Sequence, residues 1–174
     1  LHRNPETLAR LREELDAAPD LEPATTAKLP YLEAVCNESL RLYPIVTEVL
    51  RTLKKPLTVD GYDCPAGVAV SPSVMLAHRR EDVFPEPETF RPERFLDKRY
   101  SPFEFLPFGG GHRRCLGAAF AMYEMKLVLA DLLRRFEFEA VHPEPDVPVR
   151  RNVTMEPKSG VPMRVVASRS ASHN

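Results

Sequence analysis

The chain has 174 residues and a formal net charge of −1, from 24 basic and 25 acidic side chains. This balance gives no overall attraction to nucleic acid, and no apolar run approaches the roughly 18 residues that cross a bilayer, so we expect neither a nucleic-acid partner nor a membrane segment. The three cysteines are too widely spaced for a disulfide framework, which favours a reducing compartment, the cytoplasm.

The first predicted element is a helix. Asn4 and Pro5 are residue types preferred at the N-cap and at the first helical position. After them, leucines recur on one side of the helix, at Leu8, Leu11 and Leu15. Residues 16–28 contain two prolines and are predicted to form a loop.

A second helix is predicted over residues 31–43, because Pro30 can open a helix and Pro44 ends one. Glu38 and Arg41 are three residues apart and therefore share a face of this helix. From spacing alone, the simplest interpretation of this pair is an exposed ion pair worth a few tenths of a kcal/mol.

Extended structure is predicted next, because β-branched and turn-forming residues dominate this part of the chain. The strands cover residues 47–53, 57–59 and 68–70, with a hairpin turn at Asp60-Gly61. A short helix over residues 73–78 follows. Residues 84–95 are then predicted to be irregular and stiffened by prolines.

The longest predicted helix covers residues 116–135, where apolar side chains recur at helical spacing. Beyond it, alternating residues predict strands at 136–138, 149–155 and 163–166, with a turn at 158–160. Residues 168–174 are expected to be a disordered tail. This order of elements predicts a mostly α fold with small β-sheets, in the α+β class.

Residues 108–117 hold four of the seven glycines and surround Cys115, just before the longest helix. Three consecutive glycines let a bulky group approach the backbone closely. The positive end of a helix dipole favours the thiolate form of cysteine, and thiolates bind metals. A glycine linker or an inert core cysteine would explain each feature singly, but neither needs the aromatic lead-in at 103–108 beside a helix.

Zinc and haem are the two metal groups to compare for this loop. His112 and Cys115 are three residues apart, but a structural zinc site needs four ligands in paired spacing, and Cys36 and Cys64 are isolated. A haem iron needs only one thiolate, and Arg113, two residues before the sulfur, can meet an anionic propionate. The spacing therefore favours haem.

The pattern Phe108-Gly109-x-Gly111-x-Arg113-x-Cys115-x-Gly117 resembles the haem-binding loop of the cytochrome P-450 (haem-thiolate monooxygenase) family. The resemblance implies that Cys115 is the axial ligand to the iron of haem b (iron protoporphyrin IX). It also implies that the other residues of the pattern bind the cofactor, with Phe108 shielding the sulfur.

Two further segments resemble the same family. Residues 37–44 are similar to a signature that contains Glu-x-x-Arg, and residues 84–95 are similar to a segment that ends in Pro-Glu-Arg-Phe. The resemblance implies that Glu38, Arg41 and Arg94 form a buried structural network, in place of the exposed pair that spacing alone suggests.

The resemblance also implies roles around the cofactor. Arg51 is expected to meet a haem propionate, with a solvent-facing strand position as the alternative. Arg114 is expected on the sulfur side as a contact for the electron donor. Three residues after the second helix are expected in the substrate pocket: Val46, Thr47 and Val49.

The implied activity is that of an oxidoreductase, a monooxygenase that inserts one oxygen atom from O₂ into a small apolar substrate. Its electrons would come from a ferredoxin or a flavin reductase. The resemblance covers essentially all 174 residues but only the C-terminal part of the family's single domain. We therefore expect a fragment that lacks the oxygen-activating helix and is inactive alone, with any membrane anchor upstream. A non-catalytic truncated remnant and a peroxygenase relative that uses hydrogen peroxide are the alternatives.

Overall fold

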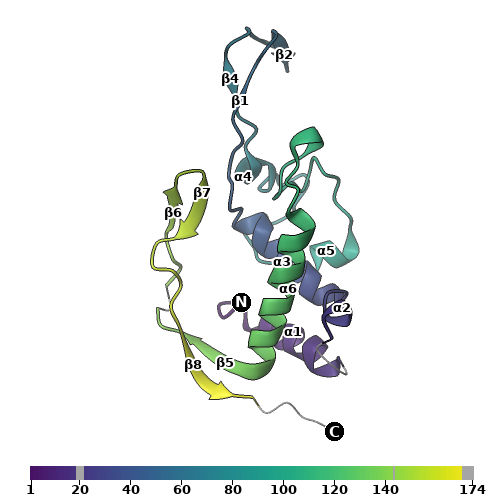
Figure 1. Cartoon of the computed structure of the whole chain (residues 1–174), viewed down its shortest axis with the longest axis vertical. Helices are drawn as coiled ribbons and strands as arrows, with labels where there is room; N and C mark the ends of the chain where they lie inside the picture. Colours follow the sequence, from purple (N-terminus) through teal and green to yellow (C-terminus); the bar gives the residue numbers. More distant parts are fainter. Residues whose placement is uncertain (19–21, 143, 170–174) are drawn as a thin grey trace.

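Three helices form the body of the protein, as the computed structural model shows for residues 1–18, 22–142 and 144–169 (Figure 1). Two of them, α1 and α3, each pack against the long helix α6 and against one another. The helices are α1 (Pro5–Ala17), α2 (Pro23–Thr26), α3 (Pro30–Leu42), α4 (Val74–Ala77), α5 (Arg94–Asp97) and α6 (Ala118–Arg135).

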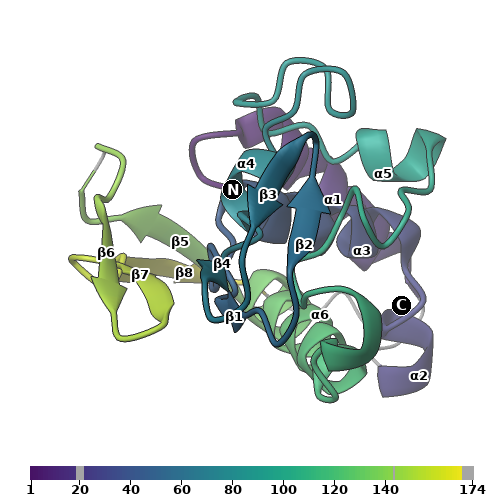
Figure 2. The same ribbon diagram turned by 90° about the horizontal axis from the view of Figure 1, so that it is seen from above.

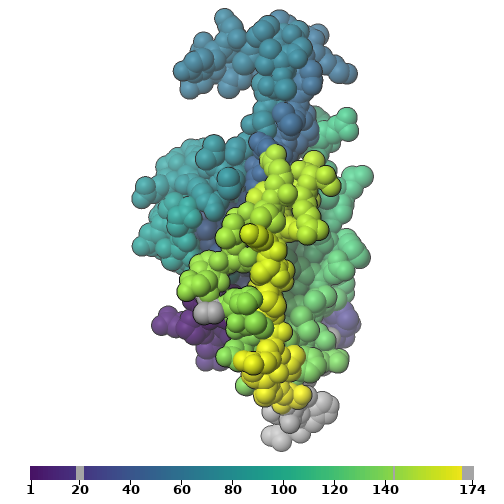
Figure 3. Space-filling model, turned by 90° about the vertical axis from the view of Figure 1, so that its left-hand side faces the viewer, coloured from purple at the N-terminus to yellow at the C-terminus, as the bar shows by residue number. Residues whose placement is uncertain are grey.

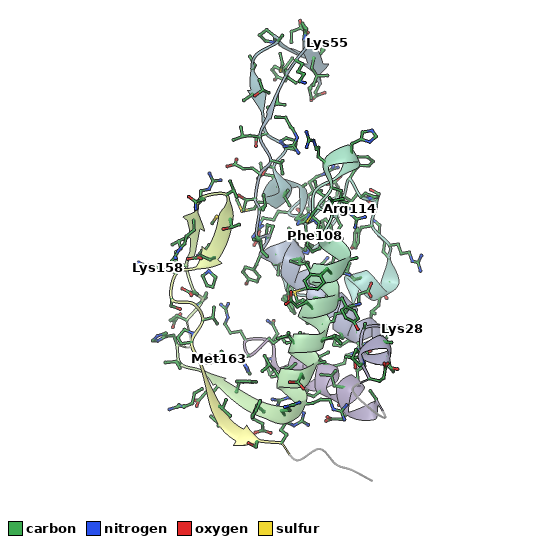
Figure 4. All side chains as sticks on the ribbon, viewed as in Figure 1. Lys28, Lys55, Phe108, Arg114, Lys158 and Met163 are labelled. Carbon is green, nitrogen blue, oxygen red and sulfur yellow. The ribbon has the colours of Figure 1, made fainter. Side chains whose placement is uncertain are left out.

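Short strands make up four two-stranded antiparallel sheets in the described part of the chain. The pairs are β1 (Arg51–Thr52) with β4 (Ala69–Val70), β2 (Leu57–Val59) with β3 (Tyr62–Cys64), β5 (Phe136–Ala140) with β8 (Met163–Ser168), and β6 (Pro148–Arg151) with β7 (Thr154–Pro157). The β2–β3 hairpin, with Lys55 nearby, projects away from the helices (Figures 1, 3 and 4). Strands β5 to β8 lie together on one side of the helices (Figures 1 and 2). The predicted α+β class is confirmed.

The core lies where α1, α3 and α6 meet. Each fully buried leucine or valine there contributes about 1.5–3 kcal/mol relative to an exposed position. A carboxylate also joins two of the helices, because Glu14 of α1 accepts hydrogen bonds from the backbone N–H groups of Tyr31 and Leu32, both at 2.8 Å. The buried members of this core are Leu8, Leu11, Leu15, Tyr31, Leu32, Val35, Cys36, Ala130 and Leu133.

The turn at Asp60-Gly61 is confirmed, since both residues have positive φ, 49° and 80°, as a two-residue hairpin requires. Three other predictions need correction. The predicted loop 16–28 contains helix α2, whose N-terminal amides are capped by the Glu22 carboxylate. The predicted strand 149–155 is a hairpin, because Asn152 takes a positive φ of 56° between β6 and β7.

The third correction concerns the predicted disordered tail, 168–174. Ser168 ends strand β8, and Arg169 donates hydrogen bonds to the Leu133 carbonyl at 2.9 Å and to the Asp16 carboxylate at 2.7 Å. Residues 170–174 lie outside the described residues. Among the residues that the structure does describe, no helix combines the length and apolar character needed to cross a bilayer.

Candidate functional site: the Cys115 loop and its groove

The cysteine loop, residues 108–117, doubles back on itself before α6. The Cys115 N–H donates to the Phe108 carbonyl at 2.9 Å, which closes the loop at its two ends. Gly109 and Gly111 have φ values of +75° and +65°, a backbone region that costs other residues roughly 1–2 kcal/mol. The glycines are therefore required by the path of the backbone.

Cys115 lies three residues before the start of α6, with Gly117 at the N-cap position. Its side chain is exposed, whereas Cys36 is buried in the core. Burial raises the pKa of the Cys36 thiol to about 12, so that group stays a neutral thiol. Of the three cysteines, only Cys115 combines an accessible sulfur with the positive end of a long helix.

A groove of about 420 Å³ lies beside this sulfur. Phe108 lies on its loop side, near the N-terminal end of α6, as its label in Figure 4 shows. The opposite wall comes from the segment after α3, including Val46 and Val49. The complete lining is Leu40, Ile45, Val46, Val49, Arg51, Pro72, Val74, Leu106, Pro107, Phe108, Gly109, Gly110, Arg113 and Cys115.

Two arginine residues, Arg51 and Arg113, line the same groove as Cys115. Both are exposed, and Arg51 Nη1 donates a hydrogen bond to the Leu50 carbonyl at 2.8 Å. Thr47, the third residue predicted in the substrate pocket, is not among the described residues that line this groove. Its carbonyl instead accepts hydrogen bonds from the backbone N–H groups of Val74 and Met75, which fasten α4 to this segment. A larger hollow of about 560 Å³, between α6 and β5, contains no cysteine among its described lining residues.

Glu38, Arg41 and Arg94 meet in the interior, with side chains at most 1% exposed. Arg41 binds both carboxylate oxygens of Glu38, through Nε at 2.7 Å and Nη2 at 2.9 Å. Arg94 Nε donates to the same carboxylate at 3.2 Å, and so does the Arg91 backbone N–H at 2.8 Å. The structure thus brings α3 together with the irregular segment and α5.

Comparison with known proteins identifies the family, since the model of the family described as Cytochrome P450 matches residues 1–162. The chain belongs to the cytochrome P450 family. Members of this family are generally haem monooxygenases that use O₂ and redox partners. A cysteine loop that lines a groove is consistent with membership of this family.

Several P450 relatives are similar over 80% or more of the chain. "Putative cytochrome P450 135B1" of Mycobacterium tuberculosis is 43% identical over 99% of this chain and 36% of its own length. Cytochrome P450 3A29 of Sus scrofa is 42% identical over 80% of this chain and 29% of its own length. The chain therefore spans about a third of the length of the curated relatives it matches.

A solved P450 structure shares the fold. "Retinoic acid bound cyanobacterial CYP120A1" superposes with a TM-score of 0.85 at 32% identity, over 95% of this chain and 39% of that one. The similarity therefore covers both the helical body and the small sheets.

The residues around the groove fit a haem. The lining combines a cysteine, two arginines and apolar residues, which are the kinds of group that suit an iron, two anionic propionates and a flat apolar ring. Within the described residues, no cluster of three or more His, Cys, Asp or Glu side chains suited to a metal occurs.

Sequence reasoning missed one residue that contacts this region. His78 is fully buried, and its Nε2 accepts a hydrogen bond from the Leu106 backbone N–H at 2.9 Å. Sequence spacing could not predict this contact, because the partner of His78 is a backbone N–H group 28 residues away, and almost any residue supplies such a group.

Proposed function

We propose that this chain is the C-terminal part, over residues 1–174, of a single P450 domain that acts as a haem-thiolate monooxygenase. The observation that supports this most is the exposed sulfur of Cys115, at the positive end of α6 and beside a groove with two arginines. The proposed reaction inserts one oxygen atom from O₂ into a small apolar substrate.

Several residues of the cysteine loop, and Arg51 of β1, have a proposed part in holding haem b. Cys115 would bind the iron through its sulfur, while Arg51 and Arg113 would pair with the propionates. A thiolate-ligated haem supplies oxygen activation, because the thiolate pushes electron density that favours O–O cleavage. Gly109 and Gly111 give the loop its positive-φ path, a Cβ at Gly117 would lie 3.8 Å from the Cys115 Sγ, and Phe108 lines the groove.

The apolar wall of the groove supports the proposed substrate class. Val46 and Val49 line the groove with branched apolar residues, together with Leu40, Ile45 and Val74. Glu48 does not serve this wall, since its carboxylate forms an ion pair with Arg150 of β6. We infer that Val46 and Val49 exclude water and contact the substrate.

The electron donor is proposed to approach from the sulfur side. His112 and Arg114, two residues of the cysteine loop, are exposed, and Figure 4 labels Arg114. A positively charged surface suits an acidic donor such as a ferredoxin or a flavin reductase, because complementary charge speeds encounter.

The decisive experiment is the absorption spectrum of the reduced, carbon-monoxide-bound protein, expressed from its natural gene. The wild type should show the thiolate-ligated form, and Cys115→Ser should lose it. Cys64→Ser is the matched control, since Cys64 lies on β3 and does not line the groove. Thiolate ligation in Cys115→Ser would refute the assignment. A protein that binds haem but does not oxidise any substrate would favour the truncated-remnant alternative.

A further inference from the structure

His78 is a buried ionisable group to which the proposed function gives no role. It follows directly after α4, is 0% exposed, and lies between the α3 helix and the lead-in to the cysteine loop. Its ring stacks on Phe105 with 5.3 Å between ring centroids, and its edge faces Phe84. Two apolar rings therefore pack against the imidazole.

The two ring nitrogens have different partners, and those partners fix the tautomer. Nδ1 lies 3.2 Å from the carbonyl oxygen of Arg41, which can only accept a hydrogen bond. Nε2 lies 2.9 Å from the backbone N–H of Leu106, which can only donate one. The neutral ring with its proton on Nδ1 satisfies both partners, and no other form does.

On one side, this ring is attached to the buried ion network. Arg41, whose carbonyl accepts from Nδ1, also donates through Nη1 to the His78 carbonyl at 2.8 Å. The same arginine binds Glu38 through two further hydrogen bonds. Because these contacts use both the main chain and the side chain of Arg41, His78 is held firmly relative to α3.

On the other side, the ring is attached to the cysteine loop through two backbone steps. Leu106, which donates to Nε2, accepts through its carbonyl from the Gly109 N–H at 2.9 Å. Phe108, two residues further on, accepts from the Cys115 N–H at 2.9 Å. A shift of the Leu106 amide would therefore move the start of the loop that carries the sulfur.

We propose that His78 is a positioning residue for the thiolate loop: its imidazole connects the Arg41 carbonyl of α3 to the Leu106 amide and so fixes where Cys115 lies beside the groove. The proposal rests on the proposed function, since it assigns the ring a purpose at the haem-thiolate site. A histidine that only fills space would pack equally well with either nitrogen unbonded.

Two variants of the protein expressed from its natural gene separate these roles. His78→Gln places an amide oxygen near the position of Nε2 and retains an acceptor for Leu106. His78→Asn places an amide near Nδ1 and retains only the bond to Arg41. Both variants remove the ring, so loss of packing alone would affect them similarly.

Hydrogen exchange of the Leu106 amide is the first readout, and it does not depend on haem. We expect wild type and His78→Gln to protect this amide and His78→Asn to exchange it at least tenfold faster. The second readout is the rate at which the reduced carbon monoxide complex loses thiolate ligation, again at least tenfold faster for Asn. Equal values for Asn and Gln in both readouts would overturn the proposal.

The wild-type protein gives a test that does not require any variant to fold. With ¹⁵N-labelled histidine, NMR should show His78 as the neutral Nδ1–H tautomer, and an Nε2–H tautomer would overturn the proposal. Failure of the proposed function has a different signature. The exchange contrast at Leu106 would persist, but the wild-type protein would show no thiolate-ligated haem.

Discussion

Removing the charge of Glu38 should destabilise the protein far more than removing an exposed charge. The Glu38 carboxylate is fully buried and accepts four hydrogen bonds, from Arg41 Nε and Nη2, from Arg94 Nε and from the Arg91 backbone. In Glu38→Gln, one oxygen becomes an amide that faces guanidinium donors, and two buried cations lose their counter-charge.

Breaking a buried ion pair in this way costs about 3–5 kcal/mol, whereas exposed pairs contribute about 0.2–1 kcal/mol. Glu88→Gln is the matched control, because Glu88 pairs with Arg79 at 2.8 Å but its side chain is 71% exposed. Urea unfolding of the protein expressed from its natural gene, followed by circular dichroism, measures both variants. A difference between them below about 1 kcal/mol would refute the reasoning, because burial would then add nothing to the strength of the network.

Four further predictions follow from the site. Burial, aided by the charges of Arg41 and Arg79, lowers the pKa of His78 from 6.5 to about 4, against the hydrogen bond to the Arg41 carbonyl. The neutral buried ring therefore contributes its full share to the free energy of unfolding above pH 6.5. As the pH falls to 4, this free energy decreases by about 3 kcal/mol, because the unfolded chain binds a proton that the buried ring does not. Urea unfolding should show this decrease in wild type and not in His78→Gln. Gly109→Ala should cost about 1–2 kcal/mol in thermal unfolding, while Gly117→Ala, at a φ of −81°, should lack this backbone penalty. Arg51→Gln and Arg113→Gln should each speed haem loss to a haem acceptor protein, and an unchanged rate would remove that residue from the proposed propionate contacts. Arg114→Glu should slow reduction by an acidic donor with unchanged haem content, and an equal rate would exclude Arg114 from docking.

Prolines and glycines made much of the helical body and the cysteine loop predictable. Pro30 and Pro44 allowed both ends of the second helix to be predicted to within one residue of α3 (Pro30–Leu42). Proline fits the first turn of a helix, but a helix cannot readily continue through one. The longest helix was placed two residues early, since Leu116 is apolar but fully exposed in the turn before α6. Apolar character alone does not reveal where a helix begins.

The missed features depend on contacts that spacing does not encode. Helix α2 is capped by Glu22, a residue type less typical of N-caps than Ser, Thr, Asp or Asn. Asn152 turns the chain within what was predicted as one strand, and this residue type tolerates positive φ more readily than most. The charged network was expected from family resemblance, because periodicity shows that Glu38 and Arg41 share a face but not that the face is buried.

The loop that carries Cys115 cannot hold its shape from its own contacts. Its glycines lose more conformational entropy on ordering than other residues do. Only a few backbone hydrogen bonds, all within residues 106–118, close the loop. Rigid partners on both sides must therefore compensate, with α6 after the sulfur and the His78–Leu106 contact before it. Since His78 is itself held by Arg41, and Arg41 by Glu38, a charge change in α3 should loosen the sulfur's position before it unfolds the helices. Thiolate ligation should accordingly be lost at lower urea concentrations than helicity in Glu38→Gln, and the two transitions should coincide in Glu88→Gln.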